Sequence, residues 1–296
     1  MKAAPQHLNE QVAQYLDLPL AKRIERIRSP RWIGYTRTKN ILAKLEDLYS
    51  YPRSHRMPNL LIIGDTNNGK TMLVQQFHAR HEPDDNLEGE SAIVPVLYVQ
   101  APPVPDEGRF YEAILDLLFA PYRPSDRVSK KQSVAITLLK RVGLRVLMID
   151  EIQHILAGST NKQRAFLNVI KYLGNELQVP IVGIGTQDAY RAIQSDPQLA
   201  NRFEPVALPR WEPGEEYLRL LMSFERMIPL REPSKLHSQA LAARLLSMSE
   251  GLIGELSRIL VTAAVRAAES GKEHIDTKLL DNIGWTPPSK RKYRAI

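Results

Sequence analysis

The segment Leu60–Thr71, with the sequence LLIIGDTNNGKT, decides the fold predicted for this chain. A short apolar run leads directly into the pattern G-x-x-x-x-G-K-T, whose glycines let consecutive backbone N–H groups converge on phosphate oxygens. A helix beginning near Lys70 would aim its positive end at the same oxygens. We therefore predict a phosphate-binding loop in which Lys70 reaches the β- and γ-phosphates and Thr71 offers its hydroxyl to Mg²⁺.

A glycine-containing turn is the alternative interpretation of this segment. The β-type residues before the loop and the plausible helix Met72–Phe77 after it favour the nucleotide-binding interpretation. The predicted ligand is a magnesium nucleoside triphosphate, with ATP and Mg²⁺ as cofactors. The residues expected to surround the nucleotide are Gly64, Asp65, Thr66, Asn67, Asn68, Gly69, Lys70, Thr71 and Met72.

A second motif, Arg145–Glu151, is a buried-strand pattern that ends in two carboxylates and is typical of a Walker B strand. An acid at the carboxyl end of a parallel strand lies beside the phosphate loop, where Asp150 can hold Mg²⁺ through water. Glu151, one residue later, can polarise an attacking water. A solvated turn would explain the acidic pair equally well without the upstream loop. Together, the two motifs favour hydrolysis of the nucleotide over binding alone.

Composition limits the class of protein. The 296 residues are 43% hydrophobic, which suffices for one large or two smaller domains with real cores. The absence of cysteine excludes disulfides, thiol catalysis and cysteine-ligated zinc. Because the chain has no apolar run of about 18 residues and no signal-peptide core, we expect a soluble, cytoplasmic protein without a membrane segment. The net charge of +7 favours a polyanionic partner.

Apolar segments alternate between strand and helix patterns along the chain. The predicted strands are Leu60–Ile63, Val94–Val99, Val146–Ile149 and Ile181–Ile184. The predicted helices between them include Phe110–Phe119, Ser133–Val142 and Gln163–Glu176. This order predicts an α/β fold, a parallel sheet with helices on both faces. After residue 212 the strand signals stop, and the pattern predicts helices at Tyr217–Met227, Gln239–Ser247, Gly254–Ser270 and Thr277–Ile283. The expected domains are an N-terminal helical arm (1–52), a nucleotide-binding α/β domain (53–212), a small helical lid (213–284) and a flexible basic tail (285–296).

These features together resemble AAA+ P-loop ATPases, and specifically the TniB family of transposition regulators, which is related to TnsC. The resemblance spans most of the chain. The two Walker motifs are generic to P-loop ATPases, whereas the Asn67-Asn68 loop and the lid sequence Gly251–Leu256 point to the narrower family. The segments that carry the resemblance are Met57–Thr71, Ile149–Ile152, Val182–Thr186, Asn201–Phe203 and Gly251–Leu256.

The resemblance implies three further roles at the nucleotide. Thr186 matches the sensor-1 position that contacts the γ-phosphate or its water, with Gln187 as the neighbouring candidate and a turn threonine as the alternative. Arg202 lies where such proteins project an arginine finger into a neighbouring subunit, which would require a homo-oligomer. A surface salt bridge to Glu204 is the alternative for Arg202, and Arg191 is a second finger candidate. Arg258 resembles the sensor-2 arginine of the lid, or is an exposed helix residue.

The resemblance also implies a ring or filament around double-stranded DNA, with phosphate contacts and little sequence preference. No self-contained DNA-reading motif is evident, so the contacts are expected from the segment after the second strand. The candidate DNA-binding residues are Arg109, Arg123, Arg127, Lys130 and Lys131. For each of these, a solvated loop is the alternative. The tail residues Lys290, Arg291, Lys292 and Arg294 either bind DNA or an acidic partner, or keep the tail soluble.

No separate nuclease site is evident, and the pattern D-E-x-x-H at Asp150–His154 is not the H-E-x-x-H zinc motif, so His154 is expected on a helix face. DNA cutting must then come from another protein. The resemblance implies an ATP-dependent regulator that assembles on target DNA, recruits a DDE-type transposase and a TniQ-like targeting protein, and disassembles on hydrolysis. A helicase loader or replication initiator is a close alternative, and a P-loop small-molecule kinase a more distant one.

Overall fold

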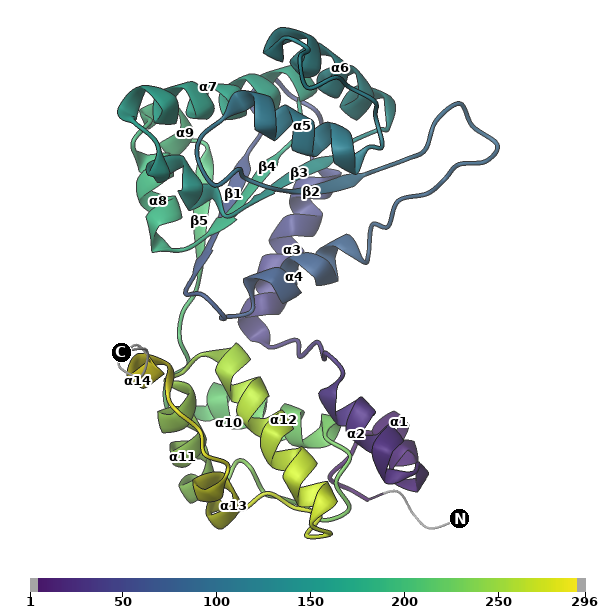
Figure 1. Cartoon of the computed structure of the whole chain (residues 1–296), viewed down its shortest axis with the longest axis vertical. Helices are drawn as coiled ribbons and strands as arrows, with labels where there is room; N and C mark the ends of the chain where they lie inside the picture. The colour runs from purple at the N-terminus through teal and green to yellow at the C-terminus, as the bar shows by residue number, and fades with distance from the viewer. Residues whose placement is uncertain (1–4, 292–296) are drawn as a thin grey trace. The chain divides into compact units, whose positions relative to one another are not determined.

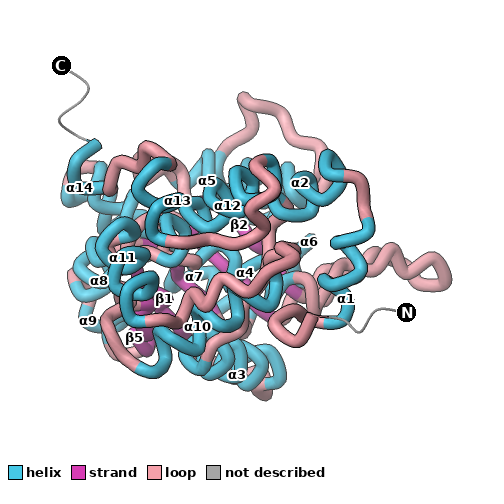
Figure 2. The backbone as a smooth tube through the Cα atoms, turned by 90° about the horizontal axis from the view of Figure 1, so that it is seen from below, coloured by secondary structure: helices cyan, strands magenta, loops and turns pink. Residues whose placement is uncertain are grey.

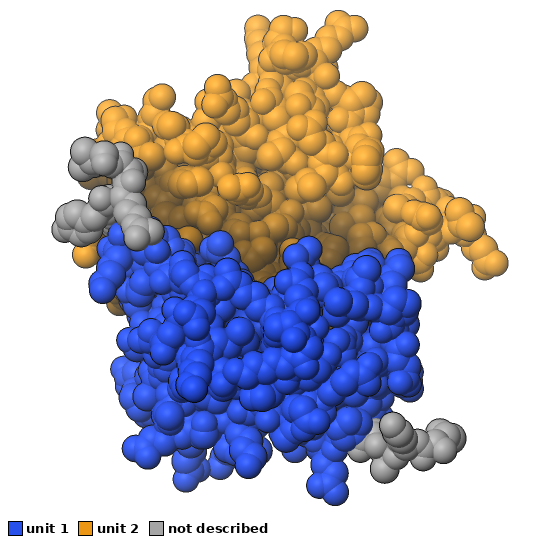
Figure 3. Space-filling model, turned by 60° about the horizontal axis from the view of Figure 1, so that its bottom comes forward, with its two compact units in different colours: residues 1–36, 67–69, 209–296 blue, residues 37–66, 70–208 orange. Residues whose placement is uncertain are grey.

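The computed structural model describes residues 5–291 of the chain. It divides into two compact units, which Figure 3 shows in different colours. Unit 1 contains residues 1–36, 67–69 and 209–296, and unit 2 contains residues 37–66 and 70–208. The phosphate loop therefore contributes residues to both units.

Unit 2 is an α/β structure built on a five-stranded sheet with the strand order β2-β3-β4-β1-β5 (Figure 1). Every neighbouring pair of strands is parallel. The strands are β1 (Asn59–Gly64), β2 (Val96–Gln100), β3 (Val146–Asp150), β4 (Ile181–Gly185) and β5 (Phe203–Leu208). The helices are α3 (Thr36–Ser50, from Arg37 on), α4 (Lys70–His78), α5 (Glu107–Leu117), α6 (Val128–Arg141), η2 (Ile152–Ala157), α7 (Thr160–Leu177), α8 (Gln187–Gln194) and α9 (Pro197–Ala200). The predicted parallel sheet and its first four strands are confirmed.

The fifth strand, β5, was not predicted from the sequence. It lies at the edge of the sheet and pairs only with β1, from Asn59 opposite Phe203 to Gly64 opposite Leu208. Only its two end residues are buried, and Pro205 interrupts its apolar pattern. An edge strand tolerates proline and exposed residues because one side of its backbone has no partner strand. The local sequence of β5 therefore lacks the apolar run that marked the other four strands.

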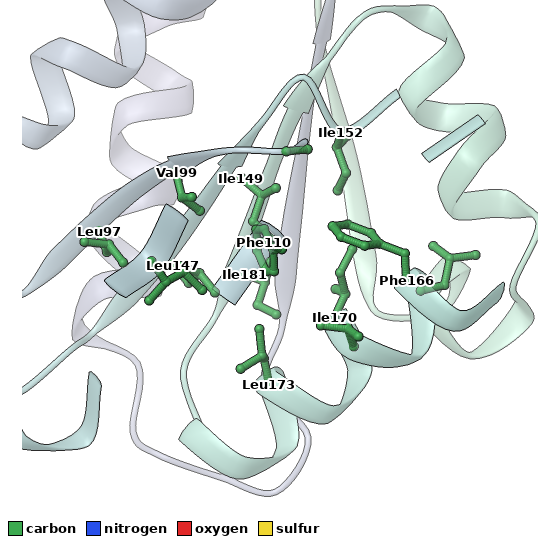
Figure 4. Packing of buried hydrophobic residues seen from close by; sticks show 14 of the residues in the cluster. Leu97, Val99, Phe110, Leu147, Ile149, Ile152, Phe166, Ile170, Leu173 and Ile181 are labelled. Atoms are coloured by element: carbon green, nitrogen blue, oxygen red, sulfur yellow. The ribbon is translucent and has the colours of Figure 1, made fainter. Parts of the chain in front are cut away.

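Alternate residues of β1 to β4 face opposite sides of the sheet, and both sides are covered. One set, which includes Leu97, Leu147 and Ile149, packs against Phe110 of α5 and Phe166 of α7 (Figure 4). Helices α5, α6 and α7 contribute most of the helical side chains in this cluster. The other set, including Leu60, Ile62 and Met148, is equally buried, and α4 contacts β1. Burial on both faces explains the continuous apolar strands in the sequence.

The described part of unit 1 contains helices and loops but no strand; its helices are among those drawn in cyan in Figure 2. Its helices are α1 (Glu10–Ala13), η1 (Gln14–Asp17), α2 (Leu20–Arg28), α10 (Glu215–Met227), α11 (Gln239–Ser249), α12 (Ile253–Glu269), α13 (Thr277–Asn282) and α14 (Pro288–Arg291). The predicted C-terminal helices are therefore present. None of the described helices is long and apolar enough to cross a membrane.

The N-terminal segment divides between the two units, whereas we expected a separate arm at residues 1–52. Ile27 and Ile33 are buried in the same apolar cluster as α10, α11 and α12. Arg23 is 4% exposed and donates to both carboxylate oxygens of Glu273, from Nη1 at 3.1 Å and from Nη2. These contacts join the first helices to the C-terminal helices and place residues up to Thr36 in unit 1.

Candidate nucleotide-binding site

Lys70 lies at the first position of α4, directly after the phosphate loop. Its Nζ donates to the carbonyl oxygens of Gly64 at 2.8 Å and Asp65 at 2.9 Å, and the residue is 9% exposed. Burial lowers the pKa of the Lys70 ammonium, while the carboxylates of Glu151, Asp150 and Asp65 act in the opposite direction. The ammonium is thus held inside the loop by two backbone carbonyls.

The two loop glycines are needed for different reasons. A Cβ atom at Gly64 would lie 3.0 Å from the carbonyl oxygen of Leu208 on β5, so a side chain there would require the two closely spaced strands to move apart by a few tenths of an ångström. Gly69 has a φ of +85°, a conformation that glycine adopts without steric cost. Asn67 also has a positive φ, 62°, which asparagine tolerates better than most residues. The loop backbone is therefore strongly curved, as predicted.

Residues 67–69 of the loop are held by the lid helices of unit 1. Asn67 Nδ2 donates to Glu255 Oε1 at 2.8 Å, and the Asn67 carbonyl accepts from the Gly254 N–H at 3.0 Å. Asn68 Nδ2 donates to the carbonyl of Pro209 at 3.0 Å. Glu255 was not predicted as a site residue. The Gly251–Leu256 sequence was recognised only as a mark of family resemblance, and its contact with the loop appears only in the structure.

The acidic pair lies at the carboxyl end of β3. Asp150 is the last residue of the strand and 7% exposed, and its Oδ1 accepts from the Glu151 N–H at 2.8 Å. Glu151 has a φ of 53°, in the left-handed region that only a few per cent of non-glycine residues adopt. This strained backbone turns the chain sharply after the strand, and such strain is common at functional sites.

Tyr98 on β2 is a partner of Asp150 that sequence reasoning missed. Its hydroxyl donates to Asp150 Oδ2. Burial raises the pKa of the Tyr98 hydroxyl, and the bond to Asp150 raises it further, so the tyrosine stays protonated and acts as a donor. The bond fixes one carboxylate oxygen of the predicted metal ligand. A tyrosine in a buried strand carries no sequence signal for this role.

Thr186 lies between β4 and α8, as the N-cap residue of the helix. Its backbone N–H donates to Gln153 Oε1 at 3.2 Å, and Gln153 Nε2 donates to Glu151 Oε2. The structure therefore connects the sensor-1 candidate to the predicted catalytic glutamate through one glutamine. Gln187, the neighbouring candidate, is the first residue of α8 and is exposed.

Arg202 lies where the strands β1 and β5 begin, whereas the phosphate loop follows the other end of β1. Its carbonyl accepts from the N–H of Asn59, the first residue of β1, whereas Gly64 is the last residue of that strand. The two ends of β1 are separated by roughly 17 Å at about 3.3 Å per residue, which exceeds the length of an arginine side chain. Arg202 therefore cannot reach the phosphate loop of its own chain.

The surroundings of Arg202 also differ from the alternative interpretation, a surface salt bridge to Glu204. Nη1 donates to Asn175 Oδ1 on α7 at 2.9 Å, while Nε is buried and has no partner. Glu204 pairs with Lys44. The second finger candidate, Arg191, is exposed on α8 and lies 3.2 Å from Asp188. Of the two finger candidates, only Arg202 thus has a buried N–H group without a hydrogen-bond partner.

Arg258, the sensor-2 candidate, lies on α12 in unit 1. Its Nη1 is 3.6 Å from Glu255 Oε1, and its guanidinium lies 5.7 Å from the centre of the Trp285 ring. The side chain is 65% exposed. Arg258 and Asn67 therefore lie close to the same carboxylate, that of Glu255. From the sequence, Arg258 was the only site residue expected from the lid.

The candidate DNA-binding residues do not share one environment. Arg109 is exposed in the first turn of α5, whereas the exposed Arg123, Arg127 and Lys130 lie in the connection between α5 and α6 and in the first turn of α6. Lys131 is 4% exposed, and its ammonium donates to Glu112 Oε1 at 2.6 Å and to the Pro124 carbonyl at 3.0 Å. These contacts support the local fold, so we do not include Lys131 in the proposed DNA surface.

The described part of the predicted flexible tail, residues 285–291, is held by unit 1. Trp285 Nε1 donates to the Met248 carbonyl at 3.1 Å, and Arg291 Nη1 donates to Glu255 Oε1 at 3.0 Å. Lys290 is in α14, while Lys292 and Arg294 lie outside the described residues. Residues 285–291 therefore have defined contacts and a short helix, where a flexible tail was expected.

His154 lies in η2, where its Nδ1 is 3.3 Å from the Ala101 carbonyl and its Nε2 is 3.9 Å from Glu151 Oε2. Residues 5–291 contain no cluster of three or more histidine, cysteine or acidic side chains suited to a metal. Mg²⁺ in a P-loop site needs no such cluster, because one carboxylate, one hydroxyl, waters and phosphate oxygens hold it. The exposed Thr71 and the carboxylate of Asp150 meet that requirement, so the residues present fit ATP with Mg²⁺.

The parallel sheet order, the phosphate loop and the acidic strand end define the fold of AAA+ P-loop ATPases. Solved structures with the same fold include Aeropyrum pernix ORC2 in ADPNP–ADP complexes, at TM-score 0.57 and 17% identity over 87% of this chain and 71% of that one. Cdc6p from Pyrobaculum aerophilum matches at TM-score 0.57 and 14% identity, over 85% and 68% of the two chains. Drosophila ORC bound to DNA matches at TM-score 0.57 and 15% identity, over 90% and 67%.

The family model described as Bacterial TniB protein matches residues 23–213, more than half of the chain. The protein belongs to the TniB family, as the resemblance of its motifs indicated. A search of curated proteins finds no match.

Proposed function

We propose that this protein is an ATP-hydrolysing switch that assembles on double-stranded DNA and regulates transposition. The observation that carries the ATPase part is the arrangement within unit 2, where Lys70 is bonded to the carbonyls of Gly64 and Asp65 after β1, and Asp150 and Glu151 stand at the carboxyl end of β3 in the same parallel sheet. A lysine for phosphate, a carboxylate for Mg²⁺ and a second carboxylate one residue later form the set that P-loop hydrolysis uses.

ATP with Mg²⁺ supplies a phosphoanhydride bond whose terminal phosphoryl group can pass to water. Lys70 would neutralise charge on the terminal phosphates, and Thr71 and Asp150 would hold the metal. Glu151 accepts the proton of the attacking water. Thr186, after the strand beside β3, contacts the γ-phosphate or its water. Arg258 reports the state of the nucleotide to the lid.

The position of Arg202 supports an oligomer. Because Arg202 lies at the amino-terminal ends of the strands, as an arginine finger it can serve only a nucleotide bound by another subunit. A guanidinium supplied in this way stabilises charge that develops on the transferred phosphoryl group. The interface is heterologous, since one subunit gives its finger and the next gives its phosphate loop, and such interfaces build rings or helical filaments.

The positive charge supports DNA as the surface on which the oligomer forms. The net charge is +7, and the exposed Arg109, Arg123, Arg127 and Lys130 gather within about twenty residues of sequence. Contacts from these side chains to phosphates give affinity without sequence preference. Membership in the TniB family supports a DDE transposase and a TniQ-like targeting protein as partners. We place this assembly in the cytoplasm.

Sedimentation with duplex DNA tests this function. The protein should sediment with DNA in the presence of ATP, and less so with ADP or without nucleotide. A transposase of the DDE class should then join the ATP-dependent complex. Capture of a replicative helicase instead would favour the helicase-loader or replication-initiator alternative. ATP-dependent phosphorylation of a small molecule, with no DNA binding, would favour the kinase.

A further inference from the structure

Gln153 forms the only bridge seen in unit 2 between the turn after β3 and the turn after β4, among the described residues. Its Oε1 accepts from the Thr186 N–H at 3.2 Å, and its Nε2 donates to Glu151 Oε2. The side chain is half-buried. Both ends of the amide are therefore used, one on a backbone group and one on the carboxylate.

Gly185 provides the space for this side chain. A Cβ atom at position 185 would lie 2.2 Å from Gln153 Oε1 and 2.7 Å from Ala189 Cβ, closer than real atoms approach. The amide of Gln153 thus lies directly against the backbone of the β4 end. The turn after β4 therefore has room for the side chain of Gln153, two positions after Glu151.

We propose that Gln153 is a positioning residue for ATP hydrolysis, which holds the Glu151 carboxylate in place and joins it to the Thr186 turn. This proposal rests on the role of Glu151 proposed above. The left-handed backbone of Glu151 sets where its side chain begins, and the Gln153 amide sets where one carboxylate oxygen ends. The other oxygen, Oε1, is left to accept the proton of water.

The bridge also links two events at the site. A displacement of the Thr186 turn shifts the Gln153 side chain, whose Oε1 accepts from the Thr186 N–H. Because Nε2 of the same amide donates to Glu151, the Glu151 carboxylate shifts with it. The orientation of the general base therefore follows the position of the sensor-1 turn. A misplaced base lowers the rate of proton transfer without changing how tightly the nucleotide binds.

The variants Gln153→Met and Gln153→Glu separate the two hydrogen bonds. Methionine keeps the length and packing of the side chain but forms neither bond. Glutamate keeps an acceptor for the Thr186 N–H, loses the donor to Glu151 and places a like charge beside it. Gln132→Met is the matched control, because Gln132 is a half-buried glutamine of the same unit that donates to the Tyr111 hydroxyl.

Amide hydrogen exchange at Thr186, measured on the nucleotide-free protein, reports the bridge directly. In Gln153→Met the Thr186 amide should exchange about ten-fold faster, as expected for the loss of one hydrogen bond. In Gln153→Glu and Gln132→Met it should exchange at the rate of the parent protein. An unchanged rate in Gln153→Met would overturn the bridge.

Steady-state kinetics then test the positioning role. Both Gln153 variants should lose about 10- to 100-fold in kcat with ATP affinity, measured by fluorescent-nucleotide titration, close to that of the parent. Gln132→Met should keep the parent kcat. A parent-like kcat in Gln153→Met and Gln153→Glu would overturn the inference while leaving the ATPase intact. Failure of the parent protein to hydrolyse ATP in the same assay would instead refute the proposed function.

Discussion

Asn67, in the middle of the phosphate loop, donates a hydrogen bond of 2.8 Å to Glu255, a buried carboxylate on the first turn of α12. The same carboxylate accepts from Arg291 and lies 3.6 Å from Arg258. One lid side chain therefore connects the loop to the C-terminal helix α14 and to the sensor-2 candidate.

Glu255 should make the stability of the protein sensitive to acid. The hydrogen bonds from Arg291 hold the pKa of the Glu255 carboxyl below its ordinary value of 4.5. A lowered pKa contributes stability above the unfolded-state value, and this contribution is lost as the pH falls through the folded-state value. Glu255→Gln should therefore show a smaller loss of Tm than the parent between about pH 5 and pH 3 in thermal unfolding. The exposed Glu215 provides a control as Glu215→Gln, and equal acid sensitivity in all three proteins would contradict the prediction.

Lys70→Ala should abolish tight ATP binding, because it removes the charge that neutralises the terminal phosphates. Assembly on DNA that depends on ATP should be lost with it. Fluorescent-nucleotide titration measures the first effect and sedimentation the second. ATP affinity equal to that of the parent protein would refute the phosphate-loop assignment.

Glu151→Gln should keep ATP and Mg²⁺ bound but lose hydrolysis, since an amide cannot take the proton of water while Asp150 still holds the metal. The rate should fall by about 10²- to 10⁴-fold, the usual contribution of a general base. Assemblies on DNA should persist longer than those of the parent. Phosphate release at the parent rate would remove Glu151 from the catalytic role.

Arg202→Ala should bind ATP normally and fail to hydrolyse it, because the finger serves the neighbouring subunit. Mixing Arg202→Ala with Glu151→Gln should restore part of the activity at interfaces that pair an intact site with an intact finger. Arg191→Ala, exposed on the same unit, is the matched variant. If confirmed mixed oligomers stay inactive, the finger lies elsewhere and Arg191 becomes the next candidate.

Lys130→Ala should weaken DNA binding, and the slope of log affinity against log salt concentration should fall by about 0.9 for the lost phosphate contact. Lys140 lies at the other end of α6, and both ammonium groups are partly exposed and ion-paired, with Asp126 and Glu176 respectively. Lys140→Ala should leave affinity and slope unchanged. Equal effects of the two substitutions would show that net charge, rather than the α5–α6 segment, controls binding.

The sequence by itself determined the nucleotide-binding part of this protein. The pattern at Gly64–Thr71 and the acidic end at Asp150-Glu151 are local requirements, because adjacent backbone N–H groups and consecutive residues do the chemistry. Strands β1 to β4 were equally visible, since burial on both faces of the sheet demands continuous apolar runs. These features needed no knowledge of contacts between distant residues.

Only the tertiary structure decided the features that depend on residues far apart in sequence. The pairing of β5 with β1 placed Arg202 at the beginning of these strands, whereas Lys70 follows the end of β1. Contacts across about 190 and 50 positions brought Glu255 to Asn67 and Tyr98 to Asp150. Packing also buried Lys131, which the sequence could not distinguish from the exposed Lys130 beside it. Side chains such as these carry no local signal, because their roles come from the partner that folding brings to them.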